Sequence, residues 1–71
     1  MPEPLFDLSR LESTLGQTAP ALKDLQKSLQ MSQARLKTDP TARDLLKEAR
    51  TDPTFNALRT LPDFQKLVPA N

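Results

Sequence analysis

Carboxylates and basic side chains are the groups in this sequence that could do chemistry. Asp44 and Glu48 lie four residues apart, so their carboxyls would share one face of a helix. Paired carboxylates can act as general acid and base. However, the chain has no His, Cys or Tyr, which removes most other general bases and nucleophiles that work near neutral pH. A solvated, charged helix face accounts for Asp44 and Glu48, so we expect no catalytic residues and no enzymatic activity.

Cofactor and metal sites lack their usual ligands. Without Cys or His, disulfides and the common zinc sites are excluded. The single glycine, Gly16, follows a helical pattern and is expected to end that helix. No glycine-rich loop is therefore present to hold a phosphate. The sequence predicts no cofactor and no metal.

A basic stripe is the second candidate site. Arg43, Lys47 and Arg50 are spaced i, i+4, i+7, which places them along one face of a helix. Such a stripe could contact phosphates or the acidic surface of a partner, or it could face water and pair with Asp39 and Glu48. The net charge is only +1 and no aromatic residue is interleaved for base stacking. Nucleic acid is therefore the alternative partner and not the expected one.

The composition predicts that helices position these groups. Leu and Ala are abundant, whereas the chain has one Val and no Ile, Tyr or Trp, which are residues that sheets favour. We expect an all-α fold, a small bundle or array of three to five helices joined by Asp-Pro corners. The start of the chain lacks the pattern of a secretion signal, and no apolar run is long enough to span a membrane. We therefore expect a cytoplasmic protein.

The spacing of leucines predicts a first helix over residues 7–15. Asp7 is its expected N-terminal cap, and Ser9 with Glu12 offers an alternative capping box. Residues 1–6 contain two prolines and are expected to be a flexible N-terminal segment. The apolar face of this helix is marked by Leu8, Leu11 and Leu15.

A second, longer helix is predicted over about residues 19–37. Thr18 is its expected cap, and Pro20 lies in the first turn, where a missing N–H costs nothing. Met31 lies beside the apolar stripe and widens it. The stripe itself consists of Leu22, Leu25, Leu29, Ser32 and Leu36.

The tetrapeptide Thr-Asp-Pro-Thr occurs at 38–41 and again at 51–54. The first turn of a helix accepts proline, and the aspartate before it can cap free N–H groups, so each Asp-Pro predicts a helix start. Asp39 and Asp52 are the expected caps of helices at about 40–50 and 53–60. A last corner at Leu61-Pro62-Asp63 leads into a final turn with Phe64, Leu67 and Val68.

Residues 34–67, ARLKTDPTARDLLKEARTDPTFNALRTLPDFQKL, resemble the end of a tetratricopeptide-repeat array. In that family a repeat commonly closes with Ala, a few residues and Asp-Pro, and terminal segments continue as Asp-Pro-x-Phe-x-x-Leu-Arg-x-x-Pro-x-Phe. The first half of the chain lacks the Trp and Tyr of the first repeat helix. The resemblance therefore implies a capping helical end piece and not the peptide-binding groove of the family.

Apolar stripes in so short a chain exceed what one small core can absorb, because a domain of this size buries only about 60% of its surface. We therefore expect a non-enzymatic protein–protein interaction module, an adaptor, inhibitor or accessory subunit that docks on a larger protein or on itself. Residues 7–68 would form the single domain and 69–71 a tail. Phe55 and Phe64 are expected either in the local core or as anchors for a partner. The candidate partner-binding residues are Phe6, Leu22, Leu25, Leu29, Met31, Leu36, Phe55 and Phe64.

Overall fold

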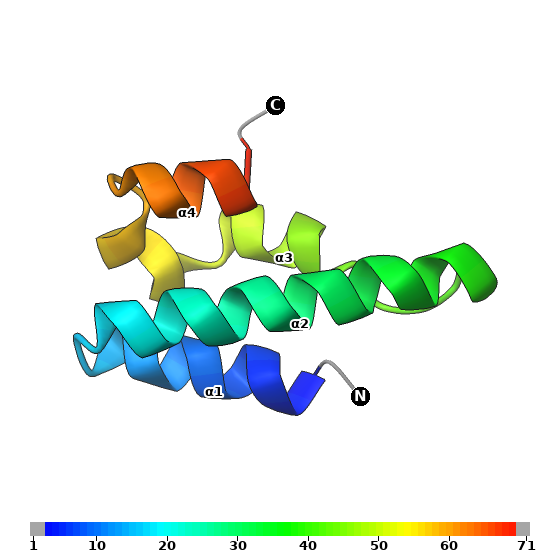
Figure 1. Ribbon diagram of the computed structural model, residues 1–71, viewed down its shortest axis with the longest axis horizontal. Coiled ribbons are helices and arrows are strands. Elements are labelled where there is room, and N and C mark those ends of the chain that lie inside the picture. The colour runs from blue at the N-terminus through cyan, green and yellow to red at the C-terminus, as the bar shows by residue number, and fades with distance from the viewer. Residues whose placement is uncertain (1–2, 70–71) are drawn as a thin grey trace.

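Helices account for nearly all of the regular structure. The computed structural model describes residues 3–69, and these contain no strand. The predicted all-α class is confirmed. In chain order the elements are α1 (Glu3–Thr14), α2 (Thr18–Thr38), α3 (Leu45–Thr51), the 3-10 helix η1 (Pro53–Leu58) and α4 (Pro62–Leu67) (Figure 1).

Helices α1 and α2 form a hairpin whose turn is set by Gly16. This residue has a φ of 78°, a left-handed conformation that glycine adopts without steric cost. The N–H of Gln17 donates to the Glu12 carbonyl at 2.8 Å, and that of Gly16 to the Ser13 carbonyl at 3.1 Å. These bonds satisfy carbonyls left free at the end of α1. Figure 1 shows α2 along the middle of the molecule, with α1 on one side and α3 and α4 on the other.

Helix α1 begins earlier than the sequence predicts. It starts at Glu3, so the prediction of a flexible segment over 1–6 is wrong for residues 3–6; residues 1 and 2 lie outside the described part of the chain. Pro4 is tolerated because it lies in the first turn, where its missing N–H would have no partner. Burial of Phe6 fixes this turn against the core. Asp7 is consequently inside the helix and exposed, and its predicted role as a cap is wrong.

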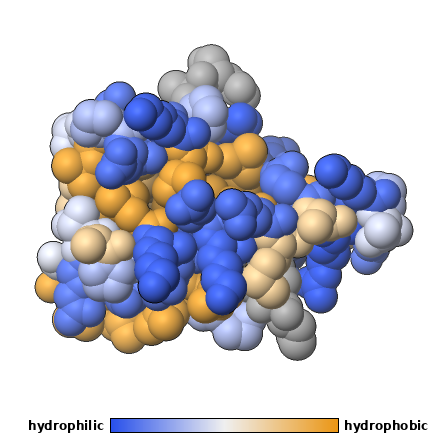
Figure 2. Space-filling model, in the orientation of Figure 1, coloured by the Kyte–Doolittle hydropathy of each residue, from blue (hydrophilic) through white to orange (hydrophobic). Residues whose placement is uncertain are grey.

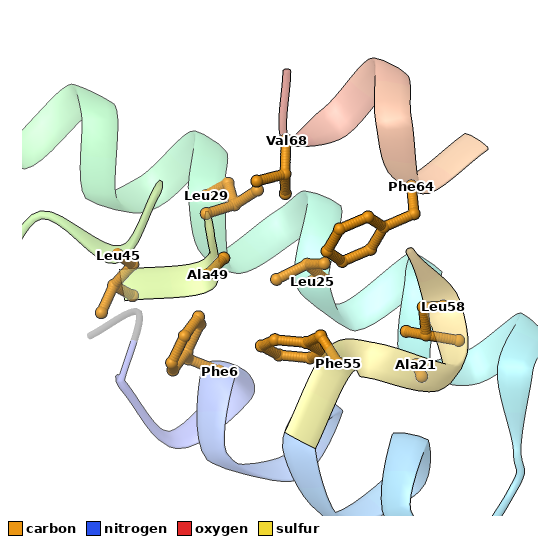
Figure 3. Close-up of a cluster of buried hydrophobic side chains, with 10 residues drawn as sticks. All are labelled: Phe6, Ala21, Leu25, Leu29, Leu45, Ala49, Phe55, Leu58, Phe64 and Val68. Atoms are coloured by element: carbon orange, nitrogen blue, oxygen red, sulfur yellow. The ribbon is translucent and has the colours of Figure 1, made fainter. Parts of the chain in front are cut away.

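Three phenyl rings form the centre of the core. Phe55 lies between the other two, with its ring centroid 5.6 Å from that of Phe6 at an interplanar angle of 67° and 5.9 Å from that of Phe64. The edge-to-face contact of Phe6 with Phe55 adds to the free energy gained by burial. The rings come from α1, η1 and α4, so the core ties the hairpin to the C-terminal elements (Figure 3). The remaining buried apolar residues are Ala21, Leu25, Leu29, Leu45, Ala49, Leu58 and Val68.

Four serines are buried between the elements. Ser9 donates to the Ala21 carbonyl at 2.8 Å and Ser13 to the Thr54 carbonyl at 2.7 Å, which joins α1 to α2 and to η1. Ser28 donates within α2 at 2.8 Å. Because each hydroxyl has a carbonyl partner, its burial carries no large desolvation penalty. The small side chains also let the backbone of α1 approach α2 closely.

The two Thr-Asp-Pro-Thr segments make the same local hydrogen bonds. Oδ1 of Asp39 accepts from the N–H and the hydroxyl of Thr41 at 3.1 and 2.6 Å. Oδ1 of Asp52 accepts from the same groups of Thr54 at 2.9 and 2.7 Å. A helix follows directly only at the second segment, where η1 begins at Pro53. The prediction of Asp52 as a cap is therefore confirmed, whereas Asp39 ends α2 and closes a turn but does not cap the N-terminus of a helix.

Helix α3 starts at Leu45, five residues later than predicted, because Ser32 binds the backbone on both sides of Asp44. The buried hydroxyl of Ser32 donates to the Arg43 carbonyl at 3.1 Å and accepts from the Leu45 N–H at 3.2 Å. Asp44 then caps α3 by accepting from the Lys47 N–H at 3.1 Å.

Helix α2 matches its predicted range within one residue at each end. Its N-terminal capping position is Gln17, which makes no side-chain capping bond, so the prediction of Thr18 as a cap is wrong. Pro20 lies in the first turn, as predicted. Among the described residues, no helix combines the length and apolar character needed to cross a bilayer.

Candidate functional site

Asp44 and Glu48, the two carboxylates spaced for acid–base catalysis, make contacts that stabilise the fold. Asp44 caps α3, and Glu48 pairs with Arg43, whose Nη2 lies 2.7 Å from Oε1. A hydrogen bond to Glu48 raises the pKa of Arg43 further above its usual value. Residues 3–69 contain no cluster of three or more acidic side chains placed to hold a metal ion. The expectation that the chain has no catalytic, cofactor-binding or metal-binding residues remains a prediction from the sequence.

The predicted basic stripe is not assembled on one helix. Arg43 precedes α3, and its guanidinium is engaged by Glu48. Arg50 lies on α3 but donates from Nε to the Pro69 carbonyl at 3.1 Å, which fixes the first residue of the predicted tail. Lys47 is exposed. The three charges therefore do not form a continuous surface for phosphates.

Most of the predicted partner-binding residues belong to the core. Phe6, Leu25, Leu29, Phe55 and Phe64 are buried, so their prediction as docking residues is wrong. The alternative expectation, that Phe55 and Phe64 pack in the local core, is confirmed. The three remaining residues are half-buried on α2: Leu22, Met31 and Leu36.

The exposed apolar surface lies instead on α1. Leu8, Leu11 and Leu15 expose 44%, 55% and 62% of their area, and together we call them the leucine face. The buried positions of α1 are Phe6, Ser9 and Ser13, which have the same spacing two residues earlier. Two residues correspond to about 200° around a helix, so the leucine face points away from the core. The sequence shows this face as a pattern but does not show which side of α1 is covered.

Acidic groups flank the leucine face. Asp7 precedes Leu8 and is exposed, and Glu12 follows Leu11. Hydrogen bonding to the Asp24 carboxyl on α2, together with burial, raises the pKa of Glu12 above its usual value of 4.5. Neither Glu12 nor Asp24 forms an ion pair with a basic group in the described chain. Glu12 and Asp24 therefore have no compensating cation within the described chain, whereas Asp7 pairs with Arg10 at 3.6 Å.

Two other carboxylates stabilise the fold. Arg10 Nε lies 2.9 Å from Asp52 Oδ2, which connects α1 to the start of η1. Burial alone would raise the pKa of Asp52, but hydrogen bonds from Thr54 and the positive charges of Arg10 and Arg59 outweigh burial and lower it. Hydrogen bonding of Glu3 to its own backbone, with the nearby Arg35 guanidinium, lowers the pKa of Glu3. Since these charges are satisfied within the fold, they are not available to a partner.

A groove between α2 and α4 is the second apolar surface. Its larger part has a volume of about 890 Å³, and a smaller part of about 420 Å³ continues toward α3. Gln26, Lys66 and Leu67 line both parts, so we treat them as one α2–α4 groove. Figure 2 shows apolar surface in this region between α2 and α4, and more along the edge formed by α1. The half-buried leucines of the groove are Leu22, Leu46, Leu61 and Leu67.

The rim of the groove is polar and mainly basic. Lys23, Lys37 and Lys66 line it and are exposed, whereas Asp63 is its one acidic residue. Gln side chains of α2 fill the positions between the lysines. An apolar floor with a positive rim fits an amphipathic helix that carries acidic residues beside its apolar face.

Known proteins give no further guidance on either surface. No family model, curated protein or solved structure matches this chain significantly.

Proposed function

We propose that this chain is a non-enzymatic protein–protein interaction module that docks through the leucine face of α1. The observation that carries the proposal is the exposure of Leu8, Leu11 and Leu15 on one side of a helix whose other side is packed against the core. Contiguous apolar surface of this kind marks sites of association in soluble proteins. Its residues are spaced like the anchors of a helix that packs into a groove or against another helix.

The free energy gained by burying the leucine face indicates whether this face alone can hold a partner. The exposed area equals about one and a half fully exposed leucines, so complete burial would contribute about 2–5 kcal/mol. Association costs at least about 4 kcal/mol in lost translational and rotational freedom. The leucine face therefore serves as the apolar centre of an interface that extends onto neighbouring residues of the hairpin.

The resemblance of residues 34–67 to the end of a tetratricopeptide-repeat array supports the same proposal. We infer that α3, η1 and α4 act as a terminal cap, because they cover one side of α2 while the outer side of α1 remains open (Figure 1). A cap of this kind would leave α1 as the surface that contacts further protein. The cytoplasmic location and the lack of enzymatic activity remain predictions from the sequence.

Affinity purification at native expression level, followed by mass spectrometry, tests the docking role. Leu11→Lys places a charge at the centre of the leucine face, and we expect it to abolish recovery of partners that the unmodified chain retains. Ala57→Lys is the matched control, because Ala57 is an exposed apolar residue on η1, outside the leucine face. Retention of the same partners by the Leu11→Lys variant would contradict the proposal.

A further inference from the structure

We propose that the chain associates with copies of itself head to tail, with the leucine face of one copy seated in the α2–α4 groove of the next. This inference rests on the proposed docking role of the leucine face and assigns it an occupant. The two surfaces lie on different elements of one molecule, so each copy can offer one and receive the other. A contact between two different surfaces is heterologous and extends into a ring or an open chain.

The dimensions of the two surfaces are compatible. Helix α1 has 12 residues and is therefore about 18 Å long. The residues of α2 that line the groove run from Thr18 to Lys37, which corresponds to about 28 Å of helix. The groove can therefore accept the whole length of the leucine face. Its half-buried leucines provide apolar contacts for that face.

The charges of the two surfaces are opposite. Beside its leucine face, helix α1 carries the carboxylates of Asp7 and Glu12, whereas the groove carries three ammonium groups and one carboxylate. Complementary charge favours the encounter and fixes the orientation of the partners. The groups of the groove are Lys23, Lys37, Asp63 and Lys66.

The pair Glu12 and Asp24 supports this orientation. Contact with the Asp24 carboxyl raises the pKa of Glu12, and neither carboxyl has a basic partner within the described chain. A lysine from the groove of a second copy would supply the missing positive charge beside α1. A symmetric contact between two leucine faces would instead bring Asp7 and Glu12 of both copies together, and like charges across an interface are unfavourable.

Sedimentation velocity from micromolar to millimolar concentration tests the self-association. We expect the unmodified chain to grow in mass with concentration and to dissociate as salt rises, since salt screens the lysine–carboxylate attraction. Leu11→Lys and the double variant Lys23→Glu/Lys66→Glu should each weaken association at least tenfold. The double variant Lys27→Glu/Lys47→Glu has the same net charge but alters exposed lysines outside the groove, so it should associate like the unmodified chain.

A mixture of the two defective variants distinguishes a head-to-tail contact from a symmetric one. The Leu11→Lys variant keeps its groove, and the Lys23→Glu/Lys66→Glu variant keeps its leucine face. We therefore expect the mixture to form a one-to-one complex that does not grow further, although each variant alone stays monomeric. Unimpaired association of the Lys23→Glu/Lys66→Glu variant would overturn the proposal in favour of a symmetric contact.

The experiments can exclude self-association without excluding the proposed docking role. A monomeric unmodified chain at every concentration, combined with partners that Leu11→Lys releases, would overturn the head-to-tail contact and leave the proposed function in place. A monomeric chain that also retains its partners after Leu11→Lys would overturn both. Circular dichroism of each variant establishes that loss of association does not come from unfolding.

Discussion

Replacing all three residues of the leucine face with glutamine should leave the chain folded. Leu8, Leu11 and Leu15 are the only large apolar residues of the described chain that expose this much area. Glutamine has nearly the helix propensity of leucine, and its own two methylene groups retain part of the apolar surface. We expect the triple variant to lose at most about 1.5 kcal/mol in total, because exposed substitutions usually cost within about 0.5 kcal/mol each.

A single change inside the core should cost more than all three changes on the surface. Leu25 is fully buried on α2, and Leu25→Gln removes its apolar contacts and leaves an amide without partners. Large-to-small changes in cores cost about 2–5 kcal/mol, and a buried unsatisfied polar group adds about 1–3 kcal/mol. A domain of 71 residues has a total stability of about 4–11 kcal/mol, so this variant should be largely unfolded or close to it.

Urea denaturation followed by circular dichroism, at low micromolar concentration where self-association does not contribute, measures both variants. The free energy of unfolding should be highest for the unmodified chain, lower for the triple variant and lowest for Leu25→Gln. If the three leucines were packed inside, their loss would cost about 6–15 kcal/mol and would abolish folding. A triple variant less stable than Leu25→Gln would therefore refute the orientation of α1 on which the docking surface depends.

Three further changes test individual parts of the fold. Ser32→Ala should cost about 1–3 kcal/mol in urea denaturation, because the buried Leu45 N–H loses its acceptor. Gly16→Ala should lower stability by about 1–2 kcal/mol, measured in the same way, through its φ of 78° alone, since no atom lies within 4 Å of the added Cβ. Glu12→Gln should raise stability at pH 7. Because the pKa of Glu12 is raised in the folded chain, its ionised carboxylate destabilises the fold. This destabilisation appears as pH rises through the folded pKa, so the advantage of glutamine should vanish below the usual value of 4.5. An equal advantage at pH 7 and below that value would show that the Asp24 contact is not its cause.

The sequence predicts those features of the fold that depend on local chemistry. Leucine and alanine content indicates the all-α class, and the glycine at position 16 marks the end of the first helix. The cap at Asp52 follows from an aspartate before a proline in the first turn of η1. These features depend on interactions between residues that lie close together in the chain, so the sequence alone is enough to predict them.

The features that the sequence does not predict depend on partners distant in the chain. Serine is counted as polar, yet Ser9 and Ser13 face inward because carbonyls of Ala21 and Thr54 satisfy them. The sequence does not show those acceptors, so it cannot tell whether the leucine side or the serine side of α1 is buried. The same limit applies to α3, whose start is delayed because Ser32 binds the loop before Leu45. The candidate site is visible in the sequence as a pattern, but its exposure is a property of the assembled fold.

The buried hydroxyls also restrict how the helices can slide past one another. Aliphatic side chains tolerate small translations, since one methyl contact replaces another at little cost. A hydroxyl at 2.7–2.8 Å from a particular carbonyl has no such freedom, and a shift of one turn would break the bonds of Ser9 and Ser13 together. A chain with few large core residues can thus select a single alignment of its hairpin. Sequence changes that replace these serines with alanine should preserve helix content while admitting several alignments, a loss of uniqueness that NMR line widths would reveal before any loss of helicity.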